Sequence, residues 1–137
     1  MIVVDASVAV KWYLPEADYE QAAALLRGSD KIAAPELARV EVTSAITRRV
    51  RLGELSASLA VAACAAWHRA LASGVVTLSP NEADLSRAIA FAIELKHPLQ
   101  DCLYLAAAAR QQAPLVTGDL RFLEKARAIY PHIRALA

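Results

Sequence analysis

The sequence predicts an α/β domain with three layers, in which helices flank both faces of a central, mainly parallel sheet. Short continuous apolar segments, such as residues 2–4 and 115–117, have the length and the β-branched content of buried strands. Longer segments with helical patterning alternate with them. The chain has 137 residues, enough for one domain, and no linker rich in proline, glycine or serine divides it. We therefore interpret residues 1–137 as a single domain.

The first half of the chain begins with a strand that ends at Asp5 and continues mainly as helix. A helix from Ser7 to Leu14 stops at Pro15, because a proline ring cannot continue a helix. Glycine, proline and serine, which typically begin or end helices, bound the later ones. The predicted elements are a strand at 2–4, helices at 7–14 and about 18–27, a strand at 31–34, a helix from Pro35 to about Leu52, and a helix from Ser56 or Ser58 to about Ser73.

The second half repeats the alternation. Its elements are a strand at 75–78, a helix from the cap Asn81 to about Lys96, a helix from Pro98 to about Gln112, a strand at 115–117 and a helix from Asp119 to about Ile129. Two strands, 2–4 and 115–117, run into aspartates, Asp5 and Asp119. Ligands of parallel sheets bind outside the carboxyl ends of the strands, so these ends are the first place to look for a site.

Composition excludes several classes of protein. The formal net charge is +1, from 15 Lys and Arg against 14 Asp and Glu, which excludes a polybasic protein that binds nucleic acid through bulk charge. No apolar run reaches the roughly 20 residues of a membrane span, and the first residues lack the basic region of a signal peptide. Cys64 and Cys102 are too few for a disulfide framework, so we expect buried thiols in a cytoplasmic protein with no membrane partner.

Four acidic residues are candidates for chemistry, although each has a simpler explanation by itself. Asp5 and Asp119 are suited to cap the helices that follow them. Asp101 lies in the first turn of a helix, where a negative charge favours the helix dipole. Glu41 lies at the edge of an apolar helix face, where Arg48 could pair with it.

Together the four acids predict a metal site. If they converge, each pair about 4 Å apart repels by about 4 kcal/mol at an effective dielectric near 20. Either some of them are then protonated, or a divalent cation lies among them. Mg²⁺ and Mn²⁺ prefer carboxylate and water oxygens. His68, His97 and His132 show no ligand spacing, and we interpret each as an ordinary surface or core histidine, which argues against zinc.

The stretches around these acids resemble a known family. They are Val3-Val4-Asp5-Ala6-Ser7, Pro35-Glu36-Leu37 through Glu41-Val42, Asp101-Cys102-Leu103-Tyr104-Leu105-Ala106 and Leu115-Val116-Thr117-Gly118-Asp119. In this order and spacing they resemble the PIN domain, and more narrowly the VapC toxins of bacterial and archaeal toxin–antitoxin systems. The similarity extends over essentially the whole chain. Gln100 and Cys102 depart from the residues common at those positions, which bears on the choice of substrate.

The resemblance implies a Rossmann-like α/β fold and an endoribonuclease dependent on Mg²⁺ or Mn²⁺. Carried over residue by residue, the acidic quartet of the family falls on Asp5, Glu41, Asp101 and Asp119, which would hold the metal and perform catalysis. Ser7 and Thr117 occupy the family's small hydroxyl positions and would orient carboxylates or waters. A metal-activated water would hydrolyse RNA and leave 5′-phosphate and 3′-hydroxyl ends.

The resemblance also implies partners. They are an RNA substrate, a VapB-type antitoxin whose tail occupies the active-site groove, and a second copy of the chain in a homodimer. Arg48, Arg49, Arg51, Arg121 and Lys125 could contact RNA phosphates, although a solvated helix face explains them equally well. Trp12, Tyr13 and Trp67 could stack on bases, but helical spacing favours a place in the core.

Two other functions are a phosphoryl-accepting domain and a catalytically silent binding module. A phosphoryl-accepting domain also places aspartates at strand ends, but the phosphatase pattern needs an acid where Ser7 stands, and a receiver needs a lysine where Asp119 stands. A catalytically silent PIN-like module would bind only protein or RNA. The presence of all four mutually repelling acids argues against such a module.

Overall fold

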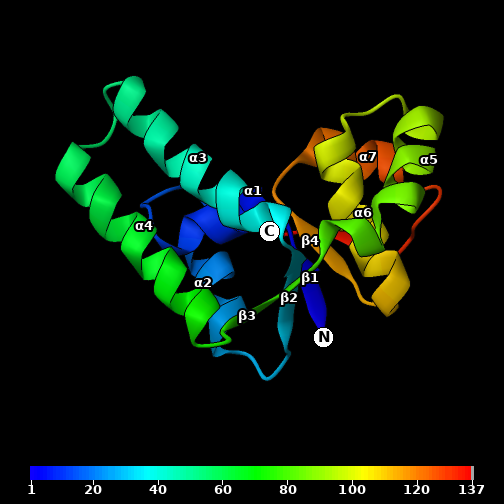
Figure 1. Cartoon of the computed structure of the whole chain (residues 1–137), viewed down its shortest axis with the longest axis horizontal. Helices are drawn as coiled ribbons and strands as arrows, with labels where there is room; N and C mark the ends of the chain where they lie inside the picture. The colour runs from blue at the N-terminus through cyan, green and yellow to red at the C-terminus, as the bar shows by residue number, and fades with distance from the viewer. Residues whose placement is uncertain (137) are drawn as a thin grey trace.

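The computed structural model describes residues 1–136 and confirms the three-layer α/β architecture. Within these residues, five strands form one sheet in the order β3-β2-β1-β4-β5, and every neighbouring pair is parallel. Figure 1 shows α1 to α4 on one side of the sheet and α5 to α7 on the other. The strands are β1 (Ile2–Val4), β2 (Ile32–Pro35), β3 (Val76–Ser79), β4 (Leu115–Thr117) and β5 (Ile133–Ala135). The helices are α1 (Ala6–Ala9), α2 (Tyr19–Arg27), α3 (Leu37–Arg51), α4 (Ala57–Ala72), α5 (Leu85–Leu95), α6 (Leu99–Gln111) and α7 (Leu120–Ala126).

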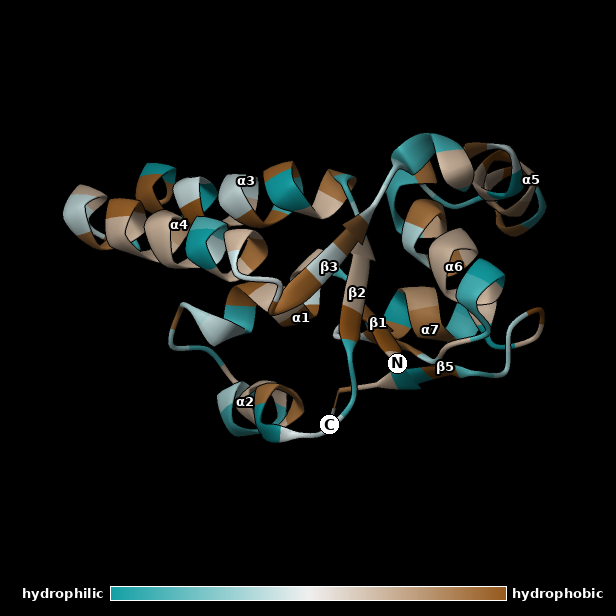
Figure 2. Ribbon diagram, turned by 60° about the horizontal axis from the view of Figure 1, so that its bottom comes forward, coloured by the Kyte–Doolittle hydropathy of each residue, from teal (hydrophilic) through white to brown (hydrophobic). Residues whose placement is uncertain are grey.

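The central strands are buried because helices cover them on both sides. β1 lies between β2 and β4, with Val3 paired to Ala33 on one side and to Leu115 on the other. Helix α6 packs against β1, β2 and β4, and its residues from 102 to 108 are all buried. The hydropathy colouring in Figure 2 shows β1, β2 and β3 as a largely apolar centre. This burial explains why the strands are continuously apolar in sequence rather than alternating.

Several predicted boundaries are wrong, and one predicted helix is divided. The helix predicted at 7–14 is α1 followed by a 3₁₀ helix, Val10–Trp12. Pro35 ends β2, where it pairs with Ser79, and does not begin α3. Asn81 begins a short 3₁₀ helix, and α5 starts only at Leu85. The edge strand β5 was not predicted.

The tryptophans and cysteines lie largely where the sequence predicts them. Trp12 and Trp67 are buried in the core, as the helical spacing indicated. Cys102 is buried and Cys64 is half-buried, and both are free thiols. No helix in residues 1–136 combines the length and the apolar character needed to cross a membrane.

Candidate active site

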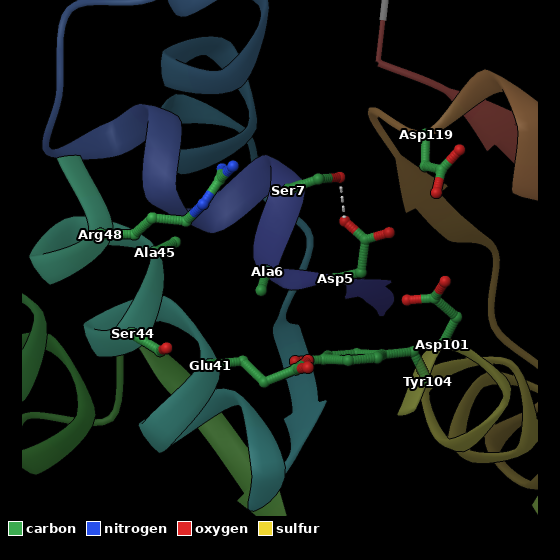
Figure 3. Close-up of a pocket in the computed structure, with 10 residues that line it drawn as sticks. All are labelled: Asp5, Ala6, Ser7, Glu41, Ser44, Ala45, Arg48, Asp101, Tyr104 and Asp119. Atoms are coloured by element: carbon green, nitrogen blue, oxygen red, sulfur yellow. Dashed lines mark hydrogen bonds between the residues drawn. The ribbon is translucent and has the colours of Figure 1, made fainter. Parts of the chain in front are cut away.

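The four predicted acids line one pocket of about 320 Å³ at the carboxyl end of the sheet. Asp5 follows β1 and Asp119 follows β4, and these two strands are neighbours. Glu41 comes from α3 in one helical layer, and Asp101 comes from the first turn of α6 in the other. Figure 3 shows these carboxylates directed toward the same space. The parallel sheet thus brings together residues that are far apart in sequence.

Asp5 is buried and held by three hydrogen bonds. The Ser7 hydroxyl donates to one carboxylate oxygen and the Thr117 hydroxyl donates to the other. The backbone amide of Val8 also donates to Asp5, which therefore caps α1, as one interpretation of the sequence predicted. These contacts fix the direction of the carboxylate before any ligand binds.

The burial of Asp5 has an electrostatic consequence. Loss of solvent raises the pKa of Asp5 from 3.8 to about 6, against the opposing effect of the hydrogen bonds from Ser7 and Thr117. The negative charge of Asp101 contributes to the same rise in pKa. A cation among these carboxylates would favour the charged form of Asp5 and so offset the effects of burial and of the Asp101 charge.

Asp119 and the loop before it complete the sheet side of the pocket. The side chain of Asp119 accepts a hydrogen bond from the Phe122 amide at 3.0 Å and so caps α7, as predicted. The Gly118 amide donates to the Ser7 hydroxyl at 2.8 Å, and a Cβ at Gly118 would lie only 3.1 Å from that oxygen. The close approach of these two loops favours glycine at this position.

Glu41 faces a tyrosine that the sequence analysis did not select. Burial raises the pKa of Glu41, while the adjacent Tyr104 hydroxyl lowers it. The Tyr104 hydroxyl is buried and has no partner of good hydrogen-bond geometry within residues 1–136. Figure 3 shows this hydroxyl beside the Glu41 carboxylate. Tyr104 lies three residues after Asp101 on α6, a spacing that could have indicated a shared helix face.

The side chain of His97 is buried, as that of a core histidine is expected to be, but the prediction that it has no ligand spacing is wrong. Its Nε2 lies 2.6 Å from Oδ2 of Asp101, and its side chain is only 7% exposed. Ligand atoms of His97, Asp101 and Asp119 lie within 4.8 Å of one another. The separation of four residues between His97 and Asp101 was the available sequence signal.

The basic residues near the pocket have different environments. Arg48 lines the pocket, and within residues 1–136 it forms no ion pair, so the suggested pairing with Glu41 is absent. Arg49 instead pairs with Glu16 at 2.7 Å and with Glu54 at 2.7 Å. Arg48 is therefore the basic side chain of α3 that is placed to contact a ligand in the pocket.

The residues present fit a hard divalent cation. Carboxylate oxygens from four elements surround the pocket, and Mg²⁺ and Mn²⁺ prefer such donors. Among the described residues, no Lys or Arg side chain forms an ion pair with any of the four acids. No Lys or Arg therefore neutralises these acids by direct contact, and among the described residues His97 is the one basic side chain paired with them.

Comparison with known proteins gives a family and a fold. A family model described as the PIN domain matches residues 2–128. A toxin–antitoxin complex from Klebsiella pneumoniae has a similar fold, with a TM-score of 0.69 and 17% identity over 100% of this chain and 98% of that chain. Mycobacterium tuberculosis VapC20, a toxin that cleaves the sarcin–ricin loop, superposes with a TM-score of 0.66 and 20% identity over 86% of this chain and 88% of its own. No curated protein sequence matches the chain.

Proposed function

The chain belongs to the PIN domain family, and on that premise we propose that it is a metal-dependent endoribonuclease, the toxin of a VapBC-type toxin–antitoxin system. The observation that carries this proposal is the convergence of Asp5, Glu41, Asp101 and Asp119 on one pocket. Of the two similar structures, one is described as a toxin–antitoxin complex and the other as a toxin that cleaves the sarcin–ricin loop. Their overall fold is the same as that of this chain.

The four acids would hold the metal, for which we propose Mg²⁺ or Mn²⁺. When bound, the ion lowers the pKa of a water ligand and neutralises charge that develops on the phosphate. Asp5 would contribute an oxygen from the end of β1, Asp101 from the first turn of α6 and Glu41 from α3. Ser7 and Thr117 donate to both oxygens of Asp5 and keep its carboxylate in one orientation.

RNA is the proposed substrate class, because the pocket also offers a positive group for a neighbouring phosphate. Arg48 and Ser44 lie on α3, and both line the pocket that the acids share. In Figure 3 they lie across the pocket from Asp101 and Asp119. A strand with one phosphate at the acids can place an adjacent phosphate near Arg48, and such a contact positions the strand without reading its bases.

The proposed protein partners are a VapB-type antitoxin and a second copy of this chain. The antitoxin is supported by the similar Klebsiella pneumoniae structure, which is described as a toxin–antitoxin complex. We propose that its tail occupies the pocket described above. The homodimer rests on family resemblance alone.

Cleavage of total RNA, tRNA and rRNA in Mg²⁺ or Mn²⁺ tests the enzymatic function. We expect fragments with 5′-phosphate ends, little cleavage in EDTA, and a loss of at least about 100-fold in rate for Asp101→Asn, because a metal ligand is removed. Asp18→Asn is the matched control, since Asp18 is exposed and outside the pocket.

The same assay separates the enzyme from a silent binding module. A protein that binds RNA and leaves it intact under every metal condition would support the silent module. Cleavage that Asp101→Asn retains at the rate of Asp18→Asn would contradict the assigned site.

A further inference from the structure

The His97 ring lies next to Asp101 of the pocket and has contacts on its face and at both nitrogens. The ring stacks on the buried Phe122 of α7, with 4.7 Å between ring centroids and 20° between planes. Its Nε2 contacts Oδ2 of Asp101 at 2.6 Å. Its Nδ1 lies 3.4 Å from Nζ of Lys125, which also donates to the carbonyl of Lys96 at 3.2 Å. The imidazole therefore has a defined contact on its face and at both nitrogens.

These contacts favour one position for the proton of the ring. An ammonium group can only donate hydrogen bonds, so Nδ1 of His97 must accept from Lys125. In the neutral ring, Nε2 then carries the hydrogen and donates it to Asp101. Nε2 in this state has no free lone pair and is unsuited to bind a metal, although it lies near Asp101 and Asp119.

We propose that His97 is a positioning residue for Asp101, and that Lys125 fixes the tautomer in which it acts. The proposal rests on the proposed metal-dependent function and extends it to two residues behind the metal site. The bond from His97 holds Oδ2 and leaves Oδ1 of Asp101 available to the pocket. Asp101 is 33% exposed, so without this bond its carboxylate has room to turn into solvent.

Asp101 needs this external support more than Asp5 does. The Asp5 carboxylate is held by Ser7, Thr117 and the Val8 amide. Among the described residues, the His97 ring is the one side chain that hydrogen-bonds Asp101. Outer partners that orient metal-binding groups typically account for 10- to 100-fold in metal affinity or activity.

Mn²⁺ affinity, measured from the rise of the melting temperature in Mn²⁺ titrations of the full chain, tests the proposal without RNA. We expect His97→Leu to weaken Mn²⁺ binding by about tenfold, because the donor to Asp101 is lost. His97→Gln, whose amide can donate in place of Nε2, should recover part of the loss. Lys125→Met should weaken binding a few-fold. His132→Leu, at an exposed histidine, is the control and should leave affinity unchanged.

Nitrogen-15 NMR of the histidine rings in the wild-type protein, with and without Mg²⁺, gives a readout that a purely structural role would not predict. We expect the Nε2 nitrogen of His97 to be protonated in both states. Loss of that proton when Mg²⁺ binds would make His97 a ligand and overturn the proposal. Wild-type Mn²⁺ affinity in His97→Leu would also overturn it.

The two proposals fail separately. If the Mn²⁺ affinities and the His97 tautomer are as expected but the protein cleaves no RNA, only the nuclease function is refuted. If the protein cleaves RNA but His97→Leu binds Mn²⁺ as tightly as wild type, only the positioning role is refuted. If His97→Leu does not fold, the NMR tautomer together with His97→Gln and Lys125→Met decides the question.

Discussion

Asp5 shows how the proposed site destabilises the metal-free protein. Burial raises the pKa of Asp5 to about 6, so the folded protein binds this proton more tightly than the unfolded chain does. The contribution of Asp5 to stability is therefore most favourable at acid pH, and it is lost as pH rises from about 4 through 6. At neutral pH the carboxylate is ionised in a buried place, in the state that can bind a cation.

Neutralising Asp5 should stabilise the protein when no metal is present. At pH 7.5 in EDTA we expect Asp5→Asn to raise the free energy of unfolding by about 1–2 kcal/mol, somewhat less than the roughly 3 kcal/mol that a shift of about two pKa units implies, because hydrogen bonds are weakened. The gain should vanish near pH 4, where wild-type Asp5 is protonated. Chemical denaturation at the two pH values measures both quantities.

Glu94→Gln is the control for this prediction, because Glu94 is exposed and lies outside the pocket. It should change stability by less than about 0.5 kcal/mol at either pH. An Asp5→Asn variant that is less stable than wild type at pH 7.5 would contradict the destabilising effect assigned to the buried charge.

At the scale of single residues, the sequence was sufficient to select four acids that line one pocket, but not their neighbours His97 and Tyr104. Asp5 and Asp119 could be predicted because both follow apolar strands, and parallel strands end at one edge. The separation of four residues between His97 and Asp101 was only a weak signal, because His97 precedes Pro98 and lies outside α6. The direction of the Tyr104 side chain depends on how α6 packs against the sheet.

At the scale of elements, α3 is the helix whose placement decides where Glu41 lies. Its first amide, that of Leu37, donates at 2.9 Å to the side-chain oxygen of Asn81, which follows β3. The sequence identified Asn81 as a cap, but of the wrong helix. Pattern within one segment cannot reveal that a side chain caps a helix 44 residues earlier in the chain.

Removing this cap should loosen the start of α3. We expect Asn81→Ala to lower the free energy of unfolding by about 1 kcal/mol, the usual value for a lost cap, and to weaken Mn²⁺ binding slightly through Glu41. Asn81→Asp keeps an acceptor at the helix N-terminus and should retain most of the stability. Denaturant unfolding and Mn²⁺ titration measure the two effects, and equal stability of Asn81→Ala and wild type would refute the capping role.

Elements were predicted best where burial is greatest. The strands β1 and β4 were predicted at their observed residues because their continuous apolar runs are characteristic of buried parallel strands. β5 was missed because it is a three-residue edge strand with the exposed Arg134 at its centre. Such a strand carries too little hydrophobic pattern to be distinguished from a loop.

At the scale of the whole molecule, the proposed metal site connects all three layers. Glu41 belongs to the helical layer of α3, Asp101 to that of α6, and Asp5 and Asp119 extend from the sheet between them. The sequence predicted the layers but not the strand order that makes β1 and β4 neighbours. Alternating strands and helices are compatible with several orders, so the convergence of the four acids required the folded structure.

A ligand that joins three layers should stabilise the fold as a unit. At a free Mn²⁺ concentration 100 times its dissociation constant, we expect the free energy of unfolding to rise by about 2.7 kcal/mol, because the ion binds only the folded protein. EDTA should reverse the gain, and Glu41→Gln should reduce it by weakening the contribution of α3, whereas Glu94→Gln should not. Hydrogen exchange should slow at the start of both α3 and α6, since both supply ligands. Protection confined to one of these helices would show that the ion does not join the two helical layers, and Glu41 or Asp101 would then not belong to the metal site.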